Sequence, residues 1–323
     1  MRRIAVTGAT GFIGRHLVAR LITRGDEVRA IVRPGSPALD RLPLPPGVVV
    51  IRAALNEASL GDAFRDADIV VHLAGVVSSV RDQTFQEVNV DGTRAVAAAA
   101  RVADAHLVNI SSLAAAGPAS ATAPRTEDDP PAPITAYGRS KLDGERAIAS
   151  VSGLRWTVLR PAIVYGPGDR AFLPLFEAAA RGLMPLVGRE SATYSVIHVD
   201  DLVSAITAAV DRRPERDTIF VAHSQPASTR QLSESVRDAV GRQTITIQVP
   251  MSLTRLAAWA GDVAGALTGR PQVINSRRYT EMSAEGFVCR VDRMRDRLEI
   301  VAQIGLNEGM TGTAAWYREI GWL

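Results

Sequence analysis

Tyr137 and Lys141 are the residues of this sequence whose types and spacing are best suited to proton transfer. A tyrosine and a lysine four positions apart on a helix lie on the same face, one turn apart. A phenol ordinarily loses its proton at about pH 10, and a neighbouring cation lowers its pKa because it favours the phenolate. Lys141 is also the only lysine in the chain. We therefore expect Tyr137 to exchange a proton with a substrate oxygen, although this spacing also occurs by chance on exposed helices.

A glycine-rich turn near the start of the chain predicts a dinucleotide site. Residues 3–7 read as a buried strand, and residues 27–32 as a second strand that follows an amphipathic helix. The glycines between them suit a tight turn, close approach to a pyrophosphate and close helix packing, with a helix N-terminus facing the phosphates. The same glycines could also serve the turn alone. The expected cofactor contacts are Gly8, Thr10, Gly11, Phe12, Ile13 and Gly14.

The end of the second predicted strand indicates which dinucleotide binds. An acidic residue there would accept hydrogen bonds from the adenosine ribose, whereas this chain has Arg33, followed by a turn through Ser36. An arginine at that point can pair with a 2′-phosphate. We therefore expect NADP, with contacts from Arg33 and Ser36. NAD stays the alternative, because a surface arginine is commonly only solvated.

Later strands are expected to bring small and polar residues to one edge of a parallel sheet. The strand predicted over residues 69–75 ends in small residues, which leave space for a cofactor. The strand predicted over residues 106–110 delivers Ser111 and Ser112 to the same edge, where a serine could hydrogen-bond a substrate oxygen opposite Tyr137. A serine pair at a strand end is also a common polar terminus. Thr135 is expected to cap the helix that carries Tyr137 and Lys141.

Composition excludes several classes of protein. The 323 residues carry a net charge of +3 with scattered arginines, which argues against nucleic-acid binding. Cys289 is the only cysteine and the histidines lack metal-ligand spacing, so we expect neither a disulfide nor a metal. No apolar run is long enough to span a bilayer, and we expect a cytoplasmic protein without a membrane partner. Residues 253–267 read as an amphipathic helix, whose apolar face (Leu256, Trp259, Val263 and Leu267) is expected to pack in a core rather than on a membrane.

Motifs in a fixed order identify a resemblance to a known family. The chain resembles an extended (atypical) short-chain dehydrogenase/reductase of the NAD(P)-dependent epimerase/dehydratase family, and more loosely, near its C-terminus, members of the 3β-hydroxysteroid dehydrogenase and dihydroflavonol reductase type. The motifs are Thr7–Gly14, His72–Gly75, Asn89–Thr93, Ile110–Ser112, Tyr137 with Lys141, Arg160-Pro161 and Ile197–Leu202.

This resemblance implies a Rossmann-type α/β fold, a doubly wound parallel sheet over residues 1–165 that is rejoined by about 195–222. Residues 166–323 would form a smaller substrate-binding region interleaved with it, and the family often forms homodimers. Tyr137 would be the general acid/base, Lys141 would lower its pKa and hold the nicotinamide ribose, Ser112 would polarise the substrate oxygen, and Asn89 would support the helix and a water relay. The further cofactor contacts it implies are Leu55, Leu73, Ala74, Gly75, Tyr137, Lys141, Pro161, Ile163 and Val164.

Departures from the family pattern bear on the substrate. Two positions at which nucleotide-sugar enzymes commonly have asparagine and arginine for a diphosphate are here Ile163 and Tyr194. We therefore expect an oxidoreductase that moves hydride between NADP(H) and a secondary alcohol or ketone of a small, fairly apolar substrate. The alternatives are a nucleotide-sugar epimerase or dehydratase, with Arg189 or Arg255 replacing the lost contacts, and a non-catalytic NADP-binding scaffold or redox sensor.

Overall fold

In the computed structural model, which describes residues 1–38, 43–269, 272 and 275–323, the described chain builds one seven-stranded parallel sheet with strand order β11-β6-β5-β4-β1-β2-β3. Its central strands are short apolar runs buried on both faces, as a parallel sheet covered by two helix layers requires. The predicted doubly wound α/β fold is confirmed. The strands are β1 (Arg3–Thr7), β2 (Glu27–Val32), β3 (Val49–Arg52), β4 (Ile69–His72), β5 (His106–Ile110), β6 (Trp156–Pro161) and β11 (Asp217–Val221).

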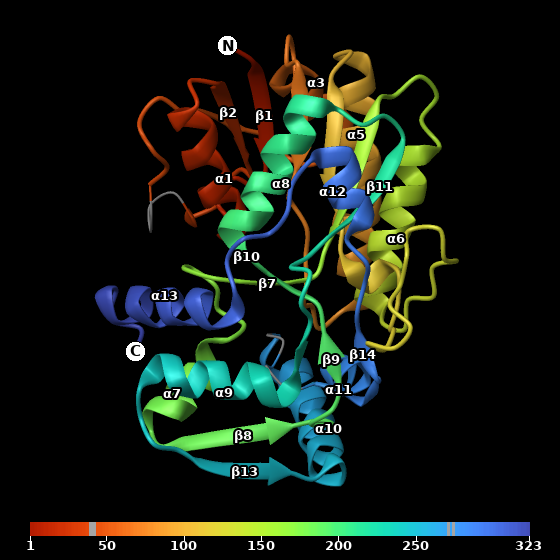
Figure 1. Cartoon of the computed structure of the whole chain (residues 1–323). Helices are drawn as coiled ribbons and strands as arrows, with labels where there is room; N and C mark the ends of the chain where they lie inside the picture. The colour runs from red at the N-terminus through yellow and green to blue at the C-terminus, as the bar shows by residue number, and fades with distance from the viewer. Residues whose placement is uncertain (39–42, 270–271, 273–274) are drawn as a thin grey trace.

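Two helix layers cover the sheet (Figure 1). One core joins the sheet to the layer of α1, α8 and α12, and a second core joins it to the layer of α3, α5 and α6. The helices are α1 (Phe12–Thr23), α8 (Val199–Arg212), α12 (Asp292–Leu298), α3 (Glu57–Ala63), α5 (Gly92–Val102) and α6 (Ala136–Ala149); α4 (Asp82–Phe85), a π-helical turn η1 (Gln86–Asp91) and a 3₁₀ turn η2 (Leu113–Ala115) lie between sheet strands in the chain.

The order of strands reverses between β1 and β4, since the chain runs outward through β2 and β3 and then returns to β4 on the other side of β1. At such a reversal the loops after neighbouring strands diverge and leave a crevice at the carboxyl edge of the sheet. The glycine turn after β1 and residues 73–76 after β4 both lie at this crevice.

A smaller lobe lies below the sheet in Figure 1, around a core of its own. Phe176 and Met184 are buried in that core, and Leu186 is also buried. The elements outside the main sheet and its layers are β7 (Ile163–Tyr165), β8 (Leu183–Val187), β9 (Thr193–Tyr194), β10 (Val196–His198), β12 (Ala227–Ser228), β13 (Ile245–Val249), β14 (Gly286–Phe287), α7 (Leu173–Ala180), α9 (Thr229–Val240), α10 (Met251–Thr268), α11 (Ser276–Ser283) and α13 (Leu306–Glu319).

The prediction that the apolar face of α10 packs in a core is wrong. The helix is where it was expected, but it packs through a stripe of small residues that includes Thr254, Ala258 and Gly265. Small side chains let a helix lie close to its neighbours, whereas the opposite, bulky face points outward. Leu256, Trp259 and Leu267 on that face are 61%, 63% and 84% exposed.

Candidate active site

The glycine turn forms the floor of the crevice between β1 and β4. Gly8 has a φ of +71°, and a Cβ at this position would lie 2.6 Å from the backbone nitrogen of Ala74. A Cβ on Gly14 would lie 2.2 Å from the Gly8 carbonyl oxygen, which explains why α1 can approach β1 so closely. The amide of Gly11 donates to the Gly8 carbonyl at 3.0 Å, and α1 begins immediately afterwards. The predicted contacts Thr10, Phe12 and Ile13 thus lie at or beside the N-terminus of this helix, where an anion is favoured.

The segment after β4 closes the other side of the crevice. The Leu73 amide donates to the Thr7 carbonyl, and the Ala74 amide donates to the Thr7 hydroxyl at 3.3 Å. Gly75 lies beside two predicted catalytic side chains, because a Cβ there would be 3.2 Å from Asn89 Oδ1 and 3.8 Å from Lys141 Nζ. The predicted cofactor segment 73–75 and the predicted proton-transfer residues therefore share one place in the fold.

A buried histidine bridges β1 and α5 beneath this segment. His72 Nδ1 lies 2.7 Å from the Thr7 hydroxyl, and its Nε2 lies 3.0 Å from the Thr93 hydroxyl. Burial and the charge of Lys141 lower the pKa of His72 to about 3, so its imidazole is neutral near pH 7. His72 is therefore a packed, neutral residue of β4.

Asn89 ties the crevice to α6. Its amide nitrogen donates to the Val76 carbonyl at 2.9 Å and to the Ser140 hydroxyl at 3.0 Å, and its amide oxygen accepts from the Val76 backbone at 2.8 Å. The wide turn of η1 presents Asn89 for these bonds, as π-helical turns commonly do at functional sites. Gly144 permits the close approach, since a Cβ there would lie 2.6 Å from the Asn89 carbonyl oxygen.

Tyr137 and Ser112 meet at the start of α6. Thr135 caps this helix as predicted, its hydroxyl accepting from the Gly138 amide at 3.1 Å. The Ser112 hydroxyl is close enough to lower the pKa of Tyr137, and the Phe85 ring centroid lies 6.3 Å from that of Tyr137. The neighbouring Ser111 instead donates to Glu145. The structure therefore distinguishes the two serines and places Ser112 at the phenol.

The expectation that Lys141 lowers the pKa of Tyr137 is wrong for this structure. Burial raises the pKa of Tyr137 above its usual value, and Lys141 is not among the groups that shift it. The Lys141 ammonium donates instead to the Ile110 carbonyl at 2.7 Å, at the end of β5. Two charged side chains of α11 act on the phenol pKa: Glu281 raises it and Arg278 lowers it.

The buried ammonium of Lys141 gives the cofactor-free protein a pH-dependent stability. Burial lowers the pKa of Lys141 from 10.5 to about 8, against a smaller opposing effect of the Glu145 charge. Between these values the unfolded chain binds more protons than the folded one, so stability rises with pH. Relative to Lys141→Met, the wild type should gain about 2 kcal/mol of unfolding free energy between pH 8 and 10. Urea unfolding across this range measures the difference, and parallel curves for the two proteins would contradict it.

The remaining predicted cofactor residues lie after β3 and on the segment that leads to the turn after β7. The turn after β7 packs on the start of α1, because a Cβ on Gly168 would lie 3.4 Å from the Phe12 ring and His16 Nε2 lies 2.8 Å from the Pro167 carbonyl oxygen. The predicted contacts Pro161, Ile163 and Val164 lead into this turn, and Ile163 is 37% exposed. Leu55 packs against Gly92 rather than against a glycine of the turn.

Arg33 and Ser36 lie at the end of β2, next to β1 in the sheet. Arg33 is exposed, and its carbonyl accepts from the Ser36 amide at 3.1 Å in a turn. Sequence reasoning missed Arg15, which joins the glycine turn to the segment after β2: its guanidinium donates to the carbonyls of Thr10 and Ala38 at 3.1 and 3.0 Å.

Other residues at the site were also missed. Phe85, Arg278 and Glu281 lie in short helices whose sequences carry no periodic or motif signal. Glu145 could have been found, since it follows Lys141 by four positions on α6 and therefore shares its face.

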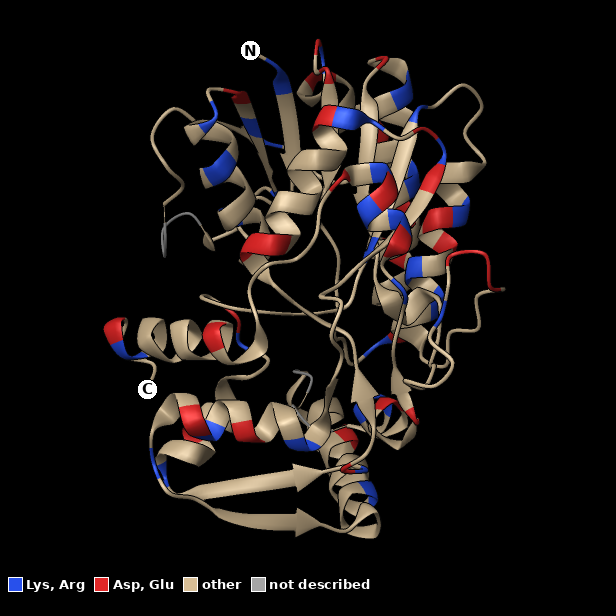
Figure 2. Ribbon diagram, viewed as in Figure 1, with Lys and Arg blue, Asp and Glu red and all other residues tan. Residues whose placement is uncertain are grey.

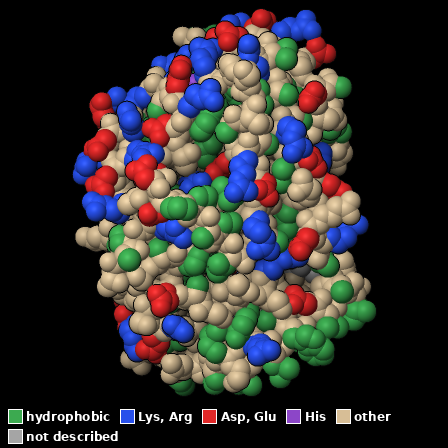
Figure 3. Space-filling view, turned by 90° about the vertical axis from the view of Figure 1, so that its right-hand side faces the viewer, with side chains coloured by type: hydrophobic (Ala, Val, Ile, Leu, Met, Phe, Trp, Pro, Cys, Tyr) green, Lys and Arg blue, Asp and Glu red, His purple; other side chains and the backbone are tan. Residues whose placement is uncertain are grey.

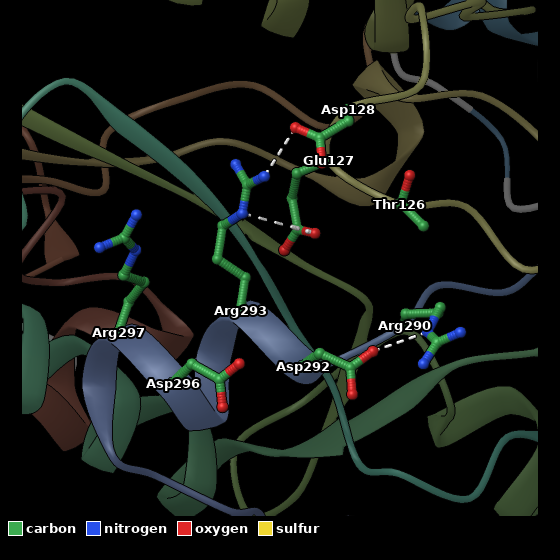
Figure 4. Close-up of a pocket in the computed structure, with 8 residues that line it drawn as sticks. All are labelled: Thr126, Glu127, Asp128, Arg290, Asp292, Arg293, Asp296 and Arg297. Carbon is green, nitrogen blue, oxygen red and sulfur yellow. Dashed lines mark hydrogen bonds and ion pairs between the residues drawn. The ribbon is translucent and has the colours of Figure 1, made fainter.

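A separate cavity of about 490 Å³ contains none of the predicted site residues (Figure 4). Its arginines are offset by acids: Arg293 lies 2.7 Å from Asp128, and Arg290 lies 2.6 Å from Asp292. The Arg293–Asp128 pair connects the long loop before α6 with α12. The residues that line the cavity are Thr126, Glu127, Asp128, Arg290, Asp292, Arg293, Asp296 and Arg297.

The chain is similar to known proteins in sequence and in fold. Residues 4–222 match the family described as the NAD dependent epimerase/dehydratase family. A ceramide reductase of Caulobacter vibrioides is 30% identical over 99% of this chain and 96% of its own length. A 4-hydroxy-2-methyl-3-oxo-4-farnesyl-3,4-dihydroquinoline-1-oxide ketoreductase of Stigmatella aurantiaca is 29% identical over 80% of each chain. Among solved structures, MoeE5 in complex with UDP-glucuronic acid and NAD superposes with a TM-score of 0.79 at 25% identity, covering 98% of this chain and 99% of its own.

Proposed function

Because the chain belongs to the NAD dependent epimerase/dehydratase family and is an NAD(P)-dependent enzyme of the extended short-chain dehydrogenase/reductase type, we propose that it reduces a ketone, or oxidises the corresponding secondary alcohol, in a small and fairly apolar substrate, with NADP(H) as cofactor. Tyr137 is the proposed general acid/base.

The glycine turn after β1, together with Gly75, leaves space that fits a dinucleotide. A side chain at Gly8 would occupy the space against Ala74, and Gly75 opens the space between Asn89 and Lys141. The residues that would hold the cofactor are those of the glycine turn and of segment 73–75, with Lys141 directed at the nicotinamide ribose. When bound, the dinucleotide supplies or accepts hydride at its nicotinamide C4.

The chain's own groups handle the proton. In the direction of reduction, Tyr137 donates its phenolic proton to the carbonyl oxygen of the substrate, and Ser112 donates a hydrogen bond to the same oxygen. Asn89 holds Val76 and Ser140 and so keeps α6 in register with the crevice. The raised pKa of Tyr137 keeps the phenol protonated at neutral pH, which suits a proton donor.

The observation that carries the choice of an apolar substrate is the surface beside the crevice. The exposed side chain of Ile163 and the half-buried ring of Tyr194 offer no charge to a diphosphate. The arginines of α11 are already compensated: Arg277 pairs with Asp82 and lies over the Phe85 ring, and Arg278 lies 4.0 Å from Glu281. The names of the two relatives, both reductases and one acting on a farnesyl compound, support the same choice.

The second candidate is a nucleotide-sugar epimerase or dehydratase, which the UDP-glucuronic acid and NAD in MoeE5 favour. A substrate panel separates the two: apolar ketones and secondary alcohols followed by NADPH absorbance, and UDP-sugars followed by product analysis. Net oxidation of NADPH by an apolar ketone is the expected result. Conversion of a UDP-sugar without net NADPH consumption would replace the proposal with the second candidate.

NADP preference is proposed from Arg33, which is exposed at the end of β2, where the sequence lacks an acidic residue. A charge-assisted hydrogen bond to phosphate contributes about 1.5–3 kcal/mol, so Arg33→Ala should weaken NADP binding about tenfold or more and change NAD binding little. Dissociation constants from fluorescence titration test this, with Arg65→Ala as the matched surface control. Tighter binding of NAD than NADP to the wild type would refute the preference.

A further inference from the structure

One end of the molecule exposes an apolar surface that the proposed reaction does not use. It comprises the outer face of α10 and the outer face of the two-stranded sheet β8–β13, and is called the apolar end below. Among the described helices none is long and apolar enough to cross a bilayer. Figure 3 shows hydrophobic side chains gathered at the lower end of the molecule, where Figure 1 places α10, β8 and β13.

The outer face of α10 is continuous along the helix. Leu256, Trp259, Val263 and Leu267 recur at helical spacing opposite the buried small stripe, and Leu253 flanks them. Arg255 and Asp262 lie toward one side of the helix. Asp262 is engaged there, since it accepts from the backbone and hydroxyl of Ser276.

The sheet β8–β13 extends the surface. Ile245, 71% exposed, pairs with Leu183, 43% exposed, and Ile247 lies two residues further along the same face. The alternate residues Met184 and Leu186 of β8 are buried, whereas Thr246 and Gln248, the alternate residues of β13, are exposed. Figure 2 shows both strands without a charged residue. An exposed apolar patch of this kind marks an interaction site.

Positive charge borders the apolar end. Residues 181–189 and 241–269 contain Arg189, Arg242 and Arg255 with the acid Asp262, whereas Arg181 in the same stretch is paired with Glu177 at 3.4 Å. An apolar face flanked by arginines matches an anionic lipid surface, where the side chains enter the headgroup region and the guanidinium groups meet phosphates.

The apolar end also leads to the candidate active site. The Asp262–Ser276 hydrogen bonds hold α10 to the N-terminus of α11, and α11 carries the Arg278 and Glu281 charges that act on Tyr137. A substrate dissolved in a bilayer would thus leave the lipid beside the helix that borders the phenol.

We infer that the apolar end docks the enzyme on an anionic membrane surface, from which it takes its substrate. That the substrate comes from the membrane rests on the proposed function. The docking itself replaces the expectation that the protein has no membrane partner.

The test is sedimentation of the full chain with vesicles of phosphatidylcholine alone and with added phosphatidylglycerol. The wild type should co-sediment with the anionic vesicles. The double variant Leu256→Ser/Trp259→Ser should have a vesicle partition coefficient lower by about tenfold or more. Both side chains are mostly exposed, so the variant should fold. The matched control is Val102→Ser, which alters an 84% exposed valine at the end of α5 and should bind as the wild type does. Arg255→Gln should reduce the preference for anionic vesicles.

Absence of the wild type from both vesicle pellets would overturn the inference, as would equal binding by the double variant. The inference would also be overturned if the wild type forms a dimer in sedimentation without lipid and the double variant does not. A second copy of the chain would then occupy the surface. None of these readouts depends on turnover. Vesicle binding by a protein that reduces no apolar ketone would support the docking surface and refute the proposed function.

Discussion

Replacing Tyr137 with phenylalanine is expected to lower kcat by about 10²–10⁴-fold, the range for loss of a general acid/base, while the affinity for NADPH changes by less than about twofold. The substitution removes a single oxygen and keeps the ring beside Phe85, so neither the packing of α6 nor the glycine turn should change. Single-turnover reduction of the best ketone of the panel and NADPH fluorescence titration measure the two quantities separately.

The serine pair provides the matched control for this result. Ser112→Ala removes the hydroxyl that acts on the pKa of Tyr137 and should lower kcat by about 10²-fold, as loss of one oxyanion donor does. Ser111→Ala changes the adjacent hydroxyl, which bonds to Glu145, and should leave kcat nearly unchanged. Turnover by Tyr137→Phe within tenfold of the wild type would refute the role of the phenol.

Glu145→Ala is expected to destabilise the protein by about 3–5 kcal/mol, because it leaves the Arg160 guanidinium buried without a counter-charge. The two side chains are 8% and 7% exposed, and Arg160 donates to both carboxylate oxygens, at 3.0 and 2.6 Å. Urea unfolding measures the loss. Glu145→Gln keeps an acceptor for Arg160 and is the variant to use if the alanine variant fails to fold.

The same helix supplies the control. Asp143→Ala breaks the exposed Asp143–Arg146 pair and should cost less than about 0.5 kcal/mol. Removing one partner of a buried ion pair is costly because the other charge stays buried alone, whereas replacing both partners by apolar residues costs little. The double variant Glu145→Leu/Arg160→Met should therefore recover most of the stability that Glu145→Ala loses. Equal, small effects of Glu145→Ala and Asp143→Ala would show that the burial of the pair has no energetic consequence.

The central sheet could be predicted because its strands are short apolar runs in a strict alternation with helices. The bounds of β1, β2 and β5 match the predicted strands, and Thr135 caps α6 as expected. The α10 prediction failed for a physical reason: hydrophobic periodicity identifies a helix with an apolar face but not which face is buried. Here the small residues, which contribute little to that periodicity, make the contact.

The candidate site shows the same limit. Motif order grouped Tyr137, Ser112, Asn89 and Lys141; in the structure Ser112 follows β5, Tyr137 and Lys141 lie on α6, and Asn89 lies on η1. The direction of the Tyr137 pKa shift could not be predicted, because it depends on burial and on α11, a segment far away in the chain. The division of labour between residues 1–165 and 166–323, the homodimer and the cytoplasmic location stay predictions.

The position of α12 has a consequence for how the chain can fold during synthesis. Met294 and Leu298 of this helix are buried in the same core as β1 and α1, and α12 packs on α8 and β11. The ribosome makes about 5–20 residues per second, N-terminus first, so the earliest strands emerge many seconds before the helix that completes their core. Until then the face of α8 that α12 covers stays exposed, and a nascent chain arrested before residue 292 should bind chaperones there.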